Sequence, residues 1–259
     1  MQGDQPNASE QTCFKWFGVG GAPEGDASVE ALQERMSNTG VTRAVNITPG
    51  WCGWDNSYTM DVLRGNEDWL AAVVLVDPLS ADGPAELAQL VAQGAGGLRI
   101  QPPCTGPLVD PRQTPIWQAA NDLGITVQCN LPQTFLDAGS CHAQPGGGNF
   151  DTPGYAQVAQ RAREFPDLKI ILDHCGWMSG GTPTSVDAVL PLSAFSNIFA
   201  KITFVQPPGG SQTPGPVAWR KSCPMVRQVV DAFGSNRCMG ASNFCGEVCF
   251  LHESLNEAD

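Results

Sequence analysis

The feature that most constrains the fold of this chain is a repeated alternation of short apolar segments with amphipathic helical segments. The apolar segments are nearly continuous runs rich in Val, Ile and Leu, such as residues 70–76 and 169–173. Strands of parallel sheets have this composition because both of their faces are buried. The pattern predicts eight strands, at residues 13–19, 44–48, 70–76, 97–101, 125–130, 169–173, 198–203 and 237–241.

The segments between these strands carry the signals of helix ends. Ser28 precedes an apolar-periodic stretch with Glu30 in its first turn, and Gly40 follows it; these are typical start and stop residues. Similar patterns predict helices at 82–94, 115–123, 154–165 and 223–233, and less regular ones at 55–63 and 184–195. Long loops rich in Gly and Pro are expected at 131–152 and 206–220.

Repeated strand–helix–strand units imply a parallel sheet with right-handed crossovers. Eight strands with helices between them in 259 residues favour an α/β fold, a (β/α)8 TIM-like barrel. The alternative, a doubly wound sheet, needs a Gly-rich phosphate loop after its first strand, and residues 18–21 lack the spacing of that loop. Residues 242–259 leave little room for a full eighth helix, so we expect a barrel that is incomplete at its C-terminal end. Whether a second copy in a homo-oligomer completes it stays open.

Charge and hydropathy exclude several classes of function. The chain has 26 acidic and 14 basic residues, and this net charge of −12 argues against nucleic acid and anionic membranes as partners. No run of 18 apolar residues occurs, so no membrane span is expected. Residues 1–12 are polar, without a cationic start and an apolar stretch. We expect them to be a flexible N-terminus, residues 13–259 to form a single barrel domain, and the protein to be cytoplasmic.

The ten cysteines include no Cys-x-x-Cys pair, the spacing typical of zinc and redox sites. Cys238, Cys245 and Cys249 lie near His252 in the sequence, which leaves a metal site as an alternative. We favour ordinary reduced thiols, several of them buried as small apolar side chains.

In a (β/α)8 barrel the active site lies at the C-terminal ends of the strands. His174 follows an apolar strand there and precedes a turn, so it is a candidate metal ligand or acid–base group, or a histidine that is only hydrogen-bonded at the rim. Gln128 and Asn130 lie at the end of the fifth predicted strand. We consider all three residues candidates for the site.

Two cations interrupt apolar strands. Arg99 and Lys201 each lie within an apolar run, where a charge is costly unless it faces a polar site or a partner. They could hold an anionic substrate, since arginine binds carboxylates at two points. A structural ion pair of Arg99 with Asp77 or Asp173 is the alternative, and the same question arises for Lys201.

Seven short motifs follow one another along the chain. They are residues 32–45 (followed by Pro49 and later by Asp55-Asn56), 73–78, 94–100, 172–176, 197–201, 233–237 and 239–243. In this order they resemble the amidohydrolase-2 branch of the amidohydrolase superfamily. The resemblance runs from about Gly18 to Phe244, and it implies the barrel that the strand–helix pattern predicts.

The family's chemistry implies a His-x-His pair on the first strand, a histidine on the sixth and an aspartate after the eighth. His174 matches the sixth-strand histidine, whereas Lys15 and Phe17 occupy the positions of the pair and Asn243 that of the aspartate. One histidine and one amide beside a lysine would bind a divalent ion poorly. We therefore expect no metal and no cofactor.

The family includes 2-pyrone-4,6-dicarboxylate lactonase, sugar-lactone hydrolases and decarboxylases, and the resemblance implies a reaction of this kind. We favour a metal-independent hydrolase of a small carboxylated lactone or cyclic ester. His174 and Asn243 would be its catalytic residues, and Lys15, Arg99, Gln128, Asn130 and Lys201 would bind the substrate. One alternative is a catalytically degenerate barrel that binds an anionic metabolite or a partner protein. A decarboxylase-like lyase ranks last, because that chemistry normally depends on the metal.

Overall fold

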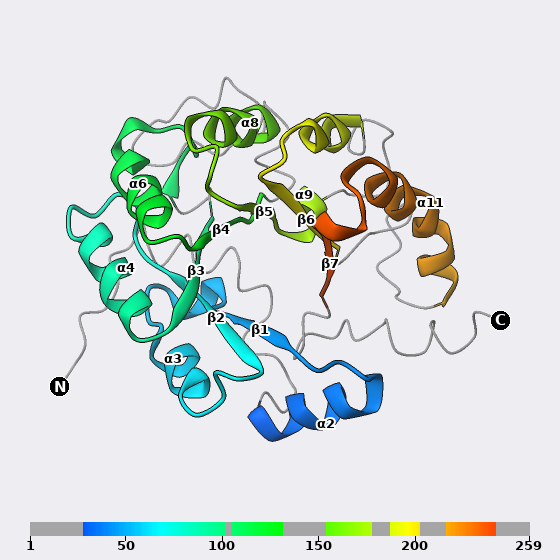
Figure 1. The fold of residues 1–259 in the computed structure, drawn as a ribbon, viewed down its shortest axis with the longest axis horizontal. Coiled ribbons are helices and arrows are strands. Elements are labelled where there is room, and N and C mark those ends of the chain that lie inside the picture. Colours follow the sequence, from blue (N-terminus) through cyan, green and yellow to red (C-terminus); the bar gives the residue numbers. More distant parts are fainter. Residues whose placement is uncertain (1–27, 102–104, 132–153, 178–186, 203–215, 242–259) are drawn as a thin grey trace.

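The computed structural model describes residues 28–101, 105–131, 154–177, 187–202 and 216–241. In these ranges seven strands form one sheet, and they lie side by side in the order in which they follow along the chain (Figure 1). Every neighbouring pair is parallel. The strands are β1 (Ala44–Ile47), β2 (Leu70–Leu75), β3 (Ala95–Ile100), β4 (Thr126–Cys129), β5 (Ile170–Leu172), β6 (Ile198–Ile202) and β7 (Cys238–Gly240).

This strand order identifies the architecture as a barrel. A doubly wound sheet reverses its strand order at a switch point, whereas here the order never reverses. The seven parallel strands curl into a half-barrel with helices along its outside, an incomplete (β/α)8 TIM barrel (Figure 1). The fold class expected from the sequence is therefore confirmed, and the predicted first strand at 13–19 lies outside the described residues.

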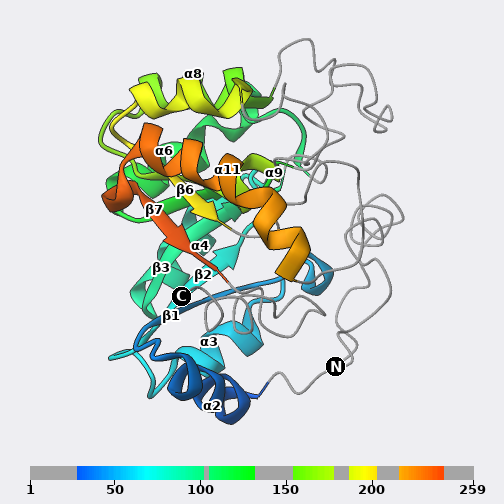
Figure 2. The same cartoon turned by 90° about the vertical axis from the view of Figure 1, so that its right-hand side faces the viewer.

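Helices connect successive strands. Viewed from the side, α2 and α3 lie at one end of the curled sheet and α8 lies at the other (Figure 2). None of the helices in the described ranges is both long and apolar enough to span a membrane. The helices are α2 (Val29–Thr39), α3 (Ser57–Leu63), α4 (Gly83–Ala92), α6 (Thr114–Asp122), α8 (Gly154–Glu164), α9 (His174–Trp177) and α11 (Pro216–Phe233).

The ends of α2 are those that the sequence predicts. The hydroxyl of Ser28 accepts a hydrogen bond from the backbone N–H of Ala31, at 3.2 Å, and so caps the helix start. Gly40 ends the helix in the left-handed conformation, with a φ of 68°.

Helix α11 begins earlier than expected. Residues 216–220 were assigned to a loop because of the Gly and Pro residues around them, but they belong to the helix, which begins at Pro216 and contains Pro224. A proline is compatible with the first turn of a helix because its missing N–H would have no partner there. The loop prediction for 206–220 was therefore wrong at its C-terminal end.

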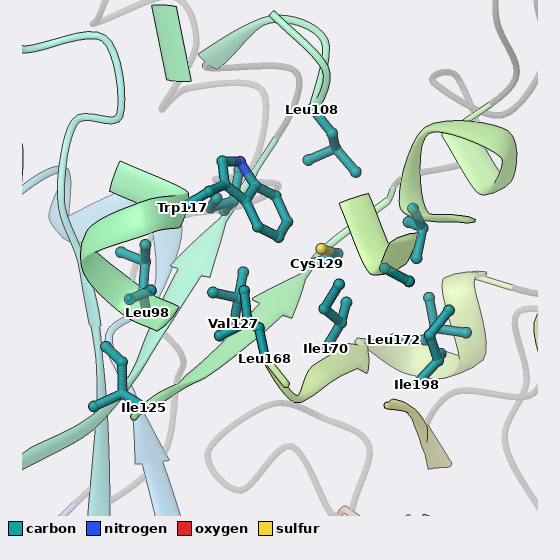
Figure 3. Packing of buried hydrophobic residues seen from close by; sticks show 14 of the residues in the cluster. Leu98, Leu108, Trp117, Ile125, Val127, Cys129, Leu168, Ile170, Leu172 and Ile198 are labelled. Carbon is teal, nitrogen blue, oxygen red and sulfur yellow. The ribbon is translucent and has the colours of Figure 1, made fainter. Parts of the chain in front are cut away.

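The hydrophobic core lies between the outer face of the sheet and the helices. Trp117 of α6 is fully buried, and it belongs to one apolar cluster with Leu98, Val127 and Ile170, which come from three successive strands (Figure 3). Its ring stacks on Phe165, with centroids 6.2 Å apart and planes inclined by 16°. Burial of apolar side chains on this outer face leaves the alternate residues of each strand facing the barrel interior.

Candidate active site

The barrel interior carries polar side chains at the C-terminal ends of the strands. Because Leu98, Val127 and Ala200 belong to the outer core, the residues that follow them, Arg99, Gln128 and Lys201, face inward. Arg99 lies directly opposite Gln128 on the neighbouring strand. These three inward-facing residues are among those that the sequence assigned to substrate binding.

Asp173 connects the two cations. Its carboxylate oxygen Oδ2 lies 2.9 Å from Nη2 of Arg99, and its Oδ1 contacts Nζ of Lys201. The side chains of Arg99, Asp173 and Lys201 are only 11%, 0% and 7% exposed, respectively. Of the two partners considered for Arg99, the structure selects Asp173; the carboxylate of Asp77 instead accepts the backbone N–H of Leu79.

The pKa values of this ion-pair network follow from burial and charge. Burial opposes ionisation of Asp173, but attraction by Arg99 and Lys201 outweighs it and holds the pKa of the carboxyl well below its usual range. Burial lowers the pKa of the Lys201 ammonium, and Asp173 opposes that shift. The carboxylate is therefore charged at neutral pH, and two cations share it.

His174 adjoins this network and is itself buried. Burial lowers the pKa of its imidazole to about 3, Lys201 and Arg99 contribute in the same direction, and Asp173 opposes them. The imidazole is therefore neutral at pH 7 and able to accept a proton. We call Arg99, Asp173, His174 and Lys201 the charged cluster.

Buried polar atoms of Arg99 and of its neighbour Gln128 have no hydrogen-bond partner among the described residues. They are Nε of Arg99, a donor, and Oε1 of Gln128, an acceptor. Buried polar atoms are normally satisfied, so such atoms call for a ligand or a water molecule. Because Arg99 and Gln128 are paired across neighbouring strands, one small molecule could reach both.

A second polar contact lies two residues further along the chain, just beyond the ends of β3 and β4. Nδ2 of Asn130 donates to Oε1 of Gln101 at 3.1 Å, and both side chains are buried. Gly50 lies against this pair, since a β-carbon there would be 2.9 Å from Nε2 of Gln101. Gln101 is not among the site residues expected from the sequence, although its two-residue spacing from Arg99 indicates that both side chains face the same side.

The structure thus brings together five of the seven residues that the sequence selected. His174, Arg99 and Lys201 surround Asp173, with Gln128 and Asn130 on the adjacent strand. Lys15 and Asn243 lie outside the described residues. Whether these residues act on a substrate stays a prediction.

Comparison with known proteins identifies the family. The sequence profile described as Amidohydrolase, of the amidohydrolase-2 branch, matches residues 18–247. The chain belongs to the amidohydrolase family. A search of curated proteins finds no match. The family expected from the seven sequence motifs is therefore confirmed.

Solved amidohydrolases share this fold at low sequence identity. The probable 2-pyrone-4,6-dicarboxylic acid hydrolase of Acinetobacter baumannii, with citric acid bound, is 17% identical, with a TM-score of 0.62 over 90% of this chain and 79% of that chain. A hydrolase of the same name from Pseudomonas putida is 18% identical, with a TM-score of 0.65 over 86% and 74%. An amidohydrolase of Burkholderia multivorans with bound zinc is 16% identical, with a TM-score of 0.65 over 95% and 83%.

Membership of the amidohydrolase family raises the question of a metal ion. The described residues contain no group of three or more His, Cys, Asp or Glu side chains that could hold one. At the charged cluster the donors would be His174 and Asp173, but both carboxylate oxygens of Asp173 already face cations. A divalent ion there would be repelled by Arg99 and Lys201, so these residues do not fit a metal.

The cysteine cluster considered in the sequence is described only at Cys238, which is a free, partly buried thiol. Cys245, Cys249 and His252 lie outside the described residues.

Proposed function

We propose that this amidohydrolase hydrolyses a small lactone or cyclic ester that carries a carboxylate, and that it does so without a bound metal. The observation that carries the proposal is the composition of the charged cluster. Two buried cations share one carboxylate, and the adjacent imidazole is neutral at pH 7, so the cluster has one positive charge in excess. A buried positive excess favours an anionic ligand.

Arg99 and Gln128 would hold the substrate. The guanidinium of Arg99 uses Nη2 for Asp173, while its Nε has no partner among the described residues and can donate to a substrate carboxylate. Oε1 of Gln128 can accept from a hydroxyl group or from water. Lys15 would add a further cation, and Asn130 would bind at the rim.

His174 would act as the general base. A water molecule attacks the carbonyl carbon of the lactone while the neutral imidazole takes one of its protons. The ring C–O bond then breaks, and the proton passes from His174 to the departing oxygen, which gives the open hydroxy acid. Asn243 would orient the water molecule.

Lys201 would stabilise the negative charge that develops on the carbonyl oxygen. Asp173 holds Lys201 and Arg99 in fixed positions before the substrate arrives, and a prearranged charge of this kind requires little reorganisation during the reaction. The same two cations disfavour a metal ion, which supports a mechanism that takes its positive charge from side chains.

One observation favours a second candidate function, binding of an anionic metabolite without turnover. An imidazole with a pKa of about 3 is a weak base, and a general base works best with a pKa near the working pH. An anionic substrate would raise the pKa of His174 by adding negative charge beside it. Activity therefore depends on how far substrate binding offsets the burial of the imidazole.

Turnover assays on purified protein test the proposal. We expect hydrolysis of 2-pyrone-4,6-dicarboxylate but not of the neutral δ-valerolactone. His174→Gln should lower kcat by roughly 10²-fold or more, and Arg99→Gln should chiefly raise KM. Arg112→Gln, which removes an exposed arginine paired with Asp110, is the matched control and should leave both constants unchanged.

Absence of turnover, together with calorimetric binding of the dicarboxylate that Arg99→Gln abolishes, would support the second candidate. Equal hydrolysis of both lactones would contradict the assignment of Arg99 to carboxylate binding.

A further inference from the structure

A strained turn follows β5 where the charged cluster forms. His174 and Cys175 have φ values of 53° and 51°, and they are the only non-glycine residues in the described ranges with a positive φ. Left-handed backbone is unfavourable for residues with a β-carbon, and two consecutive cases are unusual. Such conformations persist only where the surrounding structure enforces them, and they concentrate at functional sites.

The turn changes the direction in which His174 points. Side chains alternate between the two faces of a regular strand. Leu172 belongs to the outer core and Asp173 reaches the interior cations, so an extended His174 would be directed to the outer core again. Instead its imidazole is close enough to Asp173, Lys201 and Arg99 for their charges to influence its pKa.

Because of the turn, Cys175 and not His174 lies in the outer core. Its side chain is fully buried and belongs to the outer hydrophobic cluster. Helix α9, which begins at His174, packs against β6, the strand that carries Lys201. The left-handed turn thus places two consecutive residues, Asp173 and His174, in the barrel interior, and the next residue in the core.

We propose that the left-handed backbone at His174 and Cys175 holds the imidazole of His174 within the charged cluster, and that Cys175 positions it through its backbone conformation and not through its thiol. The inference rests on the proposed function only in naming His174 as the base. It concerns where the imidazole lies, which can be measured without a substrate.

The test compares valine and glycine at position 175. Valine is β-branched and excluded from left-handed backbone, whereas glycine adopts it without strain. The matched control is Cys129→Val, because Cys129 is an equally buried cysteine in the extended strand β4. The readout is a ¹H–¹⁵N NMR titration of His174, distinguished from His142 and His252 by the spectrum of His174→Gln.

In the wild-type protein, Cys175→Gly and Cys129→Val, we expect His174 to stay neutral down to about pH 4, as a pKa of about 3 requires. In Cys175→Val the imidazole should leave the cluster and titrate near the ordinary value of about 6.5. A low pKa retained in folded Cys175→Val would overturn the proposal.

If Cys175→Val does not fold, the pKa of His174 in Cys175→Gly tests the proposal. Retention of the low pKa supports positioning by the backbone turn. A pKa near 6.5 in Cys175→Gly would show that the thiol side chain, and not the turn, holds His174, and would also overturn the proposal. Loss of lactone turnover in a variant that keeps the low pKa would count against the proposed function alone.

Discussion

Replacing Asp173 by asparagine should destabilise the protein far more than the loss of an ordinary ion pair. The substitution keeps the size of the side chain but removes the carboxylate that pairs with both Arg99 and Lys201, the only negative charge of the charged cluster. Breaking a buried pair on one side typically costs about 3–5 kcal/mol, because the remaining charge stays buried without compensation. Here two buried cations would remain.

The matched control is Asp61→Asn. Asp61 pairs with Arg64 at 3.0 Å, but their side chains are 67% and 73% exposed, so this pair should contribute about 0–1 kcal/mol. Urea unfolding at pH 7 gives both free energies. We expect Asp173→Asn to lose about 3 kcal/mol or more, and Asp61→Asn to stay within about 0.5 kcal/mol of the wild type.

A double variant separates charge from packing. Lys201→Met added to Asp173→Asn removes one of the two uncompensated cations, so the double variant should be more stable than the sum of the two single losses implies. A loss of under about 1 kcal/mol in Asp173→Asn would refute the assignment of these residues to a buried, electrostatically coupled cluster.

Two further substitutions test the pH dependence of stability and the hydrogen bond between Asn130 and Gln101. His174 binds a proton in the unfolded chain below about pH 6.5 but in the folded protein only near pH 3, so stability should fall as the pH drops through this window. Between pH 7 and pH 5 the wild type should lose about 2 kcal/mol more than His174→Gln in urea unfolding, and an equal loss would contradict burial of a neutral imidazole. Gly50→Ala should displace Gln101, break its hydrogen bond from Asn130 and cost about 1 kcal/mol. Gly240→Ala, where a β-carbon meets no atom within 4 Å, should cost less, and equal costs would show that the contact at Gly50 is unimportant.

Much of the fold could be predicted from the sequence because the barrel imposes local patterns. Strands buried on both faces require apolar runs, which is why β2 and β5 lie where residues 70–76 and 169–173 predict them. The capping pair Ser28 and Gly40 located α2 to the residue. Arg99 and Lys201 could be identified as candidate site residues because charges within apolar strands are costly.

The partners of those charges could not be predicted, because they depend on the register of the sheet. Asp77 and Asp173 both follow apolar strands, and nothing local distinguishes them. The register of β3, β4, β5 and β6 decides which aspartate pairs with the cations, because it places Asp173 within reach of both Arg99 and Lys201. The turn after β5 could not be predicted either, since cysteine carries no signal for left-handed backbone and histidine carries only a weak one.

We propose that side-chain cations, and not a metal ion, provide the positive charge of this amidohydrolase site. The most direct measurement is the rate of 2-pyrone-4,6-dicarboxylate hydrolysis before and after removal of metals with a chelator, with the metal content of the same samples determined by mass spectrometry. We expect the rate of hydrolysis to be unchanged after chelation. The metal content should be below about a tenth of an ion per chain, because the charged cluster fits a divalent ion poorly. A rate that disappears on chelation and returns with added zinc would contradict the claim.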